Sequence, residues 1–233
     1  MNRDRILKEM GLGPIWKLRQ PPKKRRGAAP EAEPAAPVDP RTAAIAAMGW
    51  DELKQAVAGC SACELCQTRK QAVPGVGDTN ADWLFVGEGP GAEEDERGEP
   101  FVGQAGKLLD AMLAAIDLAR GPDGGVYIAN AVKCRPPGNR TPEPAETAAC
   151  WPFLARQIDL IRPKLIVALG KPAAQTLLRQ EVTISRARGL LHEYAGIPLV
   201  VTYHPAYLLR NPPEKARAWE DLCFMRGTMA RLR

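Results

Sequence analysis

Long apolar runs, targeting signals and internal repeats are all missing from this 233-residue chain. No stretch is apolar over a length sufficient to cross a membrane. The N-terminus has no short apolar segment followed by a small-residue cleavage site. These absences argue against a membrane protein and an exported one, so we expect the protein in the cytoplasm. Histidine is also scarce, with two residues in the chain.

The composition is that of a soluble globular protein, with 45% apolar and 25% charged residues. The length suits one core of ordinary size and leaves room for a tail. The net charge of +5 is unevenly distributed, because residues 1–40 hold nine of the 32 Lys and Arg but five of the 27 Asp and Glu. We predict a basic, Pro/Ala-rich extension over residues 1–40 and a folded domain over residues 41–233.

Two segments make up the predicted extension. Residues 1–19 carry an apolar pattern that predicts a short helix or a peptide that docks on a partner protein. Residues 20–40 contain a PPKKRR run and are rich in Pro, Ala and Glu, a composition that predicts a flexible linker. The basic charge suggests a polyanion partner, and a solvated tail explains it equally well.

Cysteines carry the clearest chemical signal. Four of the six come from distant parts of the chain, and each lies next to a segment with candidate functional residues. These are Cys60, Cys63, Cys134 and Cys150. Disulfides are rare inside cells, so such a set indicates metal or redox chemistry, and thiolates select zinc or iron–sulfur clusters. Cys66 is a third cysteine near the first pair. Cys223, on the last predicted helix, is expected to be a buried free thiol.

Alternating strand and helix patterns predict an α/β fold. Short apolar runs predict strands over residues 82–87, 126–129, 165–169 and 198–202. Helices are predicted around residues 50–58, 108–116, 171–178 and 214–231, and another is predicted to start at Thr141 and place Cys150 on its buried face. Strands that alternate with helices form a parallel sheet covered on both faces, and ligands bind at the carboxyl ends of its strands.

The segment after the first predicted strand is rich in glycine and acid. It reads GEGPGAEED over residues 87–95. Its carboxylates and its proline argue against phosphate, so we expect its backbone to approach an uncharged ligand. Phe101 follows, either as a core residue or as a platform that stacks on a flat ring.

Polar residues follow two further strands. Asn130 can cap a turn, or its amide can pair with the edge of a heterocycle. Arg135 and Arg140 flank a stiff Pro-Pro pair, which suits phosphates but is also common at surfaces. His204 ends the fourth strand, where a structural role is the ordinary alternative to catalysis. The apolar tip before Arg210 is similar to wedges that pry bases apart.

Three motifs and the cysteine order together resemble the family 4 uracil-DNA glycosylases, the iron–sulfur bacterial and archaeal branch of the uracil-DNA glycosylase superfamily. The motifs are GEGPGAEED with PFVGQAG, NAVKCRPPGNRTP, and HPAYLLR. The resemblance runs from about Cys60 to the C-terminus. It implies a three-layer α/β/α fold with a four-stranded parallel sheet. It also implies a monofunctional hydrolase that releases uracil from DNA in base excision repair and leaves an abasic site.

The resemblance further implies the site residues. A [4Fe–4S] cluster is expected on Cys60, Cys63, Cys134 and Cys150. Uracil is expected to contact Gly89, Glu94, Phe101, Asn130 and His204. The expected catalytic group is His204, Asn139 and Glu88. The expected DNA contacts are Arg135, Arg140, Leu208 and Arg210.

Within this set the resemblance gives individual roles. Phe101 stacks on a flipped uracil, Asn130 reads its edge, and Glu94 helps to exclude the methyl group of thymine. Leu208 fills the space that the base leaves in the helix. Gly89 stands where some superfamily branches have an aspartate that activates water, so the attacking water is expected on another residue, Asn139.

Two other functions stay open at this point. The chain can be a module that binds flipped bases without cutting, or a zinc-dependent enzyme acting on nucleotides. Structural zinc sites usually pair two close Cys-x-x-Cys knuckles, whereas the second cysteine pair here is spread over a loop and a helix, which favours a cluster. The expected partner is uracil-containing DNA, single- or double-stranded, bound by a monomer.

Overall fold

The computed structural model describes residues 39–232, so the predictions for residues 1–38 lie outside the described residues. Six strands form one sheet in the order β1-β3-β2-β4-β6-β5. The four central strands are parallel and match the four predicted strands: β3 (Val126–Asn130), β2 (Trp83–Gly87), β4 (Leu165–Leu169) and β6 (Ile197–Thr202). They are buried on both faces almost throughout, which explains their continuous apolar sequences.

Two antiparallel edge strands were not predicted. β1 (Val76–Gly77) pairs with β3 and is two residues long, too short to give a periodic signal. β5 (Leu191–Tyr194) pairs with β6, and its residues are exposed or half-buried. The predicted four-stranded sheet is therefore the parallel centre of a six-stranded one.

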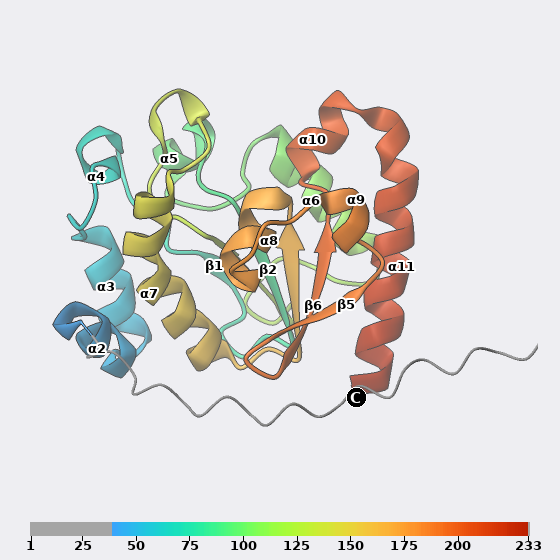
Figure 1. Cartoon of the computed structure of the whole chain (residues 1–233), viewed down its shortest axis with the longest axis horizontal. Coiled ribbons are helices and arrows are strands. Elements are labelled where there is room, and N and C mark those ends of the chain that lie inside the picture. Colours follow the sequence, from blue (N-terminus) through green and yellow to red (C-terminus); the bar gives the residue numbers. More distant parts are fainter. Residues whose placement is uncertain (1–38, 233) are drawn as a thin grey trace, which may run out of the picture. The chain divides into compact units, whose positions relative to one another are not determined.

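Helices cover both faces of the sheet (Figure 1). One core lies between the sheet and α6 (Gln104–Ala114) with α11 (Lys215–Leu232). A second core lies on the opposite face, under α7 (Pro144–Ile161), α8 (Lys171–Leu178) and α9 (Ile184–Ala187). A third, smaller cluster joins α7 to the N-terminal helices α2 (Pro40–Ala47), α3 (Trp50–Ala58) and α4 (Leu65–Thr68). This arrangement confirms the predicted three layers.

The strand order places a crevice at the carboxyl end of β2. β3 lies on one side of β2 and β4 on the other, so the order in which strands are added to the sheet reverses at β2, although all three strands are parallel. Loops that leave the sheet at such a reversal diverge, and ligands bind between them. Short elements rim this crevice: α5 (Ala92–Arg97), η1 (Pro137–Asn139) and α10 (Pro205–Arg210), which is followed by η2 (Pro212–Glu214).

Two local predictions are wrong. The helix predicted to start at Thr141 starts at Pro144, because Glu143 caps it and its own amide donates to Glu146 Oε2 at 2.7 Å. Cys223 is exposed rather than buried, because it lies outside the buried face of α11. None of the described helices is long and apolar enough to cross a membrane.

Candidate active site and cysteine cluster

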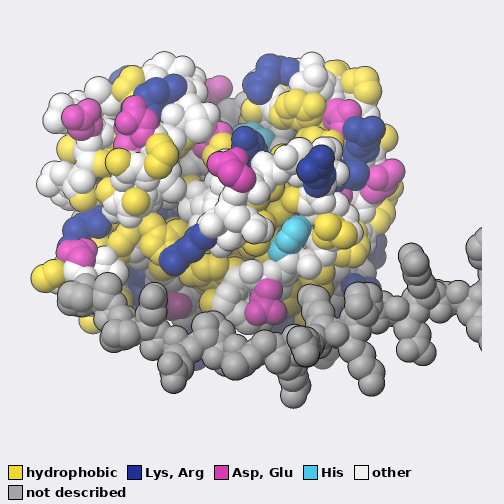
Figure 2. Space-filling view, in the orientation of Figure 1, with side chains coloured by type: hydrophobic (Ala, Val, Ile, Leu, Met, Phe, Trp, Pro, Cys, Tyr) yellow, Lys and Arg dark blue, Asp and Glu magenta, His cyan; other side chains and the backbone are white. Residues whose placement is uncertain are grey.

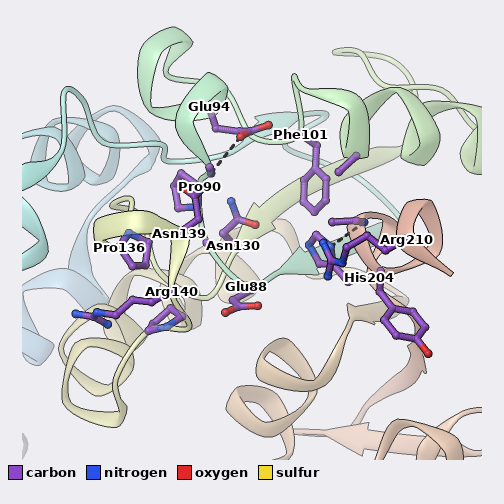
Figure 3. A pocket seen from close by; sticks show the side chains of 16 residues that line it. Glu88, Pro90, Glu94, Phe101, Asn130, Pro136, Asn139, Arg140, His204 and Arg210 are labelled. Atoms are coloured by element: carbon purple, nitrogen blue, oxygen red, sulfur yellow. Dashed lines mark hydrogen bonds between the residues drawn. The ribbon is translucent and has the colours of Figure 1, made fainter.

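A cavity of about 360 Å³ lies at the carboxyl ends of β2, β3 and β6 (Figure 3). This volume is at the lower end of the range for small-ligand sites. The cavity collects most residues that the motifs predicted to act together: Glu88, Gly89, Glu94, Phe101, Asn130, Asn139, Arg140, His204 and Arg210. Three loops that are distant in sequence therefore form one site.

Asn130 is the last residue of β3, and its side chain is 2% exposed. Its amide Oδ1 has no hydrogen-bond partner among the described residues, although the residue lines the cavity. A Cβ on Gly87, the residue opposite Asn130 in β2, would lie 2.4 Å from this oxygen and 2.7 Å from Phe101 Cζ, so glycine is required there. An unsatisfied buried oxygen costs about 1–3 kcal/mol. A donor on a bound molecule would remove that cost.

Glu94 fixes the loop that carries Phe101. Its Oε2 accepts from the Gly91 amide at 3.1 Å, and its Oε1 accepts from the amides of residues 102 and 103 at 2.9 and 3.1 Å. The carboxylate thus joins the turn after β2 to the next loop. Phe101 itself has a φ of 55°, and its ring centroid lies 5.4 Å from that of His204.

His204 caps α10 and is held in one tautomer. Its Nδ1 accepts from the Ala206 amide at 3.1 Å, which leaves the proton of the neutral ring on Nε2. Burial, assisted by the nearby charge of Arg210, lowers the pKa of His204 to about 4. At neutral pH the ring is therefore an uncharged donor beside the cavity.

Gly170 lies against His204, and this contact was not predicted from the sequence. It follows β4 with a φ of 90°, and a Cβ there would lie 2.9 Å from His204 Cβ. Any other residue would be strained and would push the histidine away. The signal in the sequence was a glycine directly after the buried run LIVAL.

Glu88 and Gly89 form the wall of the cavity after β2. Burial raises the pKa of the Glu88 carboxyl, and a hydrogen bond with the Thr141 side chain partly opposes this. A Cβ on Gly89 would lie 2.8 Å from Val132 Cγ2. A carboxylate side chain at position 89 therefore does not fit unless Val132 moves.

The three predicted arginines differ in what they contact. Arg135 does not line the cavity; its Nε donates to Asn139 Oδ1 at 2.7 Å and so orients that amide. Arg140 lines the cavity, but its guanidinium donates to both carboxylate oxygens of Glu146, at 2.9 and 2.6 Å. Arg210 forms no ion pair within residues 39–232. Of the two arginines that line the cavity, Arg210 is thus the one whose charge is available to a ligand.

Five cysteines line a small hole on the α7 side of the domain: Cys60, Cys63, Cys66, Cys134 and Cys150. All are free thiols. Across residues 39–232, no three His, Cys, Asp or Glu side chains converge closely enough to hold a single metal ion. Five sulfur side chains therefore share one hole, and sulfur is a ligand for zinc and for iron–sulfur clusters.

Three of these sulfurs accept hydrogen bonds, and all three belong to predicted ligands. Arg41 Nη2 lies 3.7 Å from Cys60 Sγ, Arg69 Nη1 lies 2.8 Å from Cys134 Sγ, and the Lys133 amide lies 3.2 Å from Cys150 Sγ. Cys63, the fourth predicted ligand, accepts no hydrogen bond within residues 39–232. Within the described residues, Cys66 receives no such bond. Donors of this kind stabilise thiolates.

Burial opposes the charge on these sulfurs. It raises the pKa of the Cys134 thiol, and it raises that of Cys150 to about 11. Thiols of this kind become thiolates at neutral pH when a metal takes the place of the proton. The donors and the burial together fit a metal cluster on these residues.

Comparison with known proteins places the chain in a family. The model of the uracil DNA glycosylase superfamily matches residues 74–223. A type-4 uracil-DNA glycosylase of Archaeoglobus fulgidus is 45% identical over 170 residues, which span 70% of this chain and 84% of that protein. The type-4 enzyme of Thermotoga maritima is 46% identical over 71% of this chain and 85% of its own length. The chain belongs to the type-4 uracil-DNA glycosylases. A type-5 enzyme of Pyrobaculum aerophilum is less similar, at 35% identity over 60% of the chain.

In this type-4 glycosylase the residue predicted as the wedge lies in the core. Leu208 is 1% exposed and belongs to the core that α6 and α11 form with the sheet. Its neighbours on α10, Tyr207 and Leu209, are 37% and 42% exposed, and Tyr207 lines the cavity. Consecutive helical residues point about 100° apart. Only a structure reveals which of two adjacent leucines faces inward.

Proposed function

We propose that this protein hydrolyses the bond between uracil and deoxyribose in DNA, leaves an abasic site, and so starts base excision repair in the cytoplasm. The buried, unpartnered Oδ1 of Asn130 carries this proposal, because it requires a donor from a ligand in a cavity of small-ligand size. The similar proteins of Archaeoglobus fulgidus and Thermotoga maritima, both named type-4 uracil-DNA glycosylases, support it.

Uracil recognition follows from the polar groups of the cavity. The target nucleotide must leave the helix, since its sugar carbon is unreachable inside a duplex. The Phe101 ring stacks on the flipped base, and Asn130 accepts from N3–H and donates to O4. Cytosine presents the opposite pattern and leaves unpaired polar groups. Glu94 holds the loop that closes the site against the methyl group of thymine.

Bond cleavage follows from His204 and Asn139. The sugar becomes oxocarbenium-like as uracil leaves as an anion, and the Nε2–H of neutral His204 donates to uracil O2, where the charge develops. Asn139 uses its free amide nitrogen to hold the attacking water, because Arg135 occupies its oxygen. Glu88, when ionised, stabilises the cationic sugar, and the proton that the attacking water loses passes to the departing uracil anion.

The proposed cofactor is a [4Fe–4S] cluster on Cys60, Cys63, Cys134 and Cys150, which ties the N-terminal helices to the loop that carries Asn139. Iron measured after replacement of each cysteine by serine tests the ligand set, with Cys66→Ser as the matched control. Full iron retention in Cys134→Ser or Cys150→Ser refutes the assignment.

DNA is expected to contact the exposed tip of α10, where Leu209 enters the helix and Arg210 meets phosphate. Basic and acidic side chains alternate over the face in Figure 2 and form no broad patch of one sign there. We expect a monomer to be sufficient, because the cavity is complete within one chain.

The deciding experiment incubates the purified full-length protein with strands that contain one uracil, one thymine or one cytosine. We expect alkali-labile sites with uracil alone, on single and double strands. A gel shift of the uracil strand without alkali-labile sites would show a binding module instead of an enzyme.

A further inference from the structure

Lys133 is buried between the cavity and the cysteines. It lies three residues after β3 and directly before Cys134, and it is 1% exposed. Its Nζ donates to the main-chain oxygen of Asn130 at 2.8 Å and to Gln157 Oε1 at 2.6 Å. Its amide donates to Cys150 Sγ.

No carboxylate in the described part of the chain pairs with the Lys133 ammonium. A buried charge without a counter-charge is expensive. Lys133 lines the same small hole as Cys134 and Cys150. Both are proposed cluster ligands, so the counter-charge of this lysine is the thiolate-bound cluster itself.

The other end of the contact is the residue proposed to read uracil. The ammonium holds the main chain of Asn130, while Gln157 is anchored in turn by donating to the Pro74 oxygen at 2.6 Å. The Asn130 amide oxygen lies 2.4 Å from the point where a Cβ on Gly87 would be, so it uses the space that this glycine leaves. A displacement of the main chain at Asn130 therefore moves the amide that must meet the base.

We propose that Lys133 is the counter-ion of the cluster and a positioning residue for uracil, and that it couples the charge of the cluster to the affinity of the cavity. This inference rests on the proposed function. The cluster then does more than hold loops together, because its negative charge stabilises the Lys133 ammonium that positions Asn130.

The test compares Lys133→Met with Arg69→Met in the full-length, iron-loaded protein. Arg69 donates to Cys134 Sγ but does not contact Asn130. Both variants should shift the cluster potential to more negative values in an EPR-monitored titration, because each loses a cation that stabilises the reduced, more negative cluster. Lys133→Met should also weaken binding of free uracil by about 5- to 150-fold, the usual range for coupled sites. Arg69→Met should weaken it less. The exposed Lys107→Met is the control for an ordinary loss of charge.

A second measurement uses the wild-type protein and needs no variant. Coupling is reciprocal, so saturating free uracil should shift the wild-type cluster potential. An unchanged potential in the presence of bound uracil overturns the inference, and so does wild-type uracil affinity in an iron-loaded Lys133→Met. Failure of the wild type to bind uracil at all counts against the proposed function instead.

Discussion

Replacement of His204 by alanine tests the proposed chemistry most directly. The Ala206 amide occupies Nδ1, so the neutral ring has one donor, Nε2–H, to offer to uracil O2. The substitution removes this single donor from a buried site. Loss of one such donor lowers the rate of the chemical step by about 10²–10³, or about 2.7–4 kcal/mol. We expect this loss in single-turnover cleavage of a uracil-containing strand.

The pH profile adds a second criterion. With a pKa of about 4, His204 is neutral from pH 5 to 8, so it contributes no inflection to the rate across this range. In the unfolded chain its pKa is about 6.5, so the unfolded state binds a proton first on acidification. The wild type should therefore lose stability as pH falls from 6.5 towards 4, and His204→Ala should lose less of it.

The matched control is His192→Ala. His192 lies in β5, and its Nε2 pairs with the Ala187 oxygen at 2.8 Å, away from the cavity residues. It should cleave at the wild-type rate. An undiminished rate in His204→Ala would falsify the leaving-group assignment, and an inflection near pH 6.5 that this variant abolishes would show that the charged ring is the active form.

Three further predictions concern the base, the helix and the extension. Asn130→Asp should slow uracil release and move the preference towards cytosine in cleavage assays, and a full uracil rate in this variant would make Asn130 structural. Leu209→Ala should slow cleavage of uracil in duplex DNA but not in single strands, and an equal loss of rate on both substrates rules out the wedge. Leu208→Ala should instead lower the thermal midpoint, because it opens a cavity in the core that costs about 2–5 kcal/mol. Deletion of residues 1–38, which keeps the Asp39 cap of α2, should preserve folding and base release but weaken DNA binding at low salt, because it removes all of the formal net positive charge. A deletion variant that binds DNA as tightly as the full chain contradicts this.

The predictable part of the fold is the part with strong local signals. β4 and α8 have the predicted bounds, because a buried apolar run and a proline in the first helical turn define them locally. The predicted cavity residues also meet, since a parallel sheet brings its carboxyl ends to one edge. What the sequence could not supply depends on packing between distant segments. Three features depend on such packing. Leu208 points inward, Gly170 leaves room for His204, and the Lys133 side chain reaches from the cysteines to Asn130.

Val132 occupies the space that a side chain at position 89 would need, and this bears on how the enzyme's chemistry can change over evolution. With 2.8 Å between a Cβ at position 89 and Val132 Cγ2, an aspartate that arrives alone meets a filled space. The same aspartate fits once residue 132 has become smaller, and a smaller residue 132 by itself leaves a void. The two positions are therefore epistatic, and a lineage that changes its way of activating water must pass through one unfavourable intermediate or change both residues together.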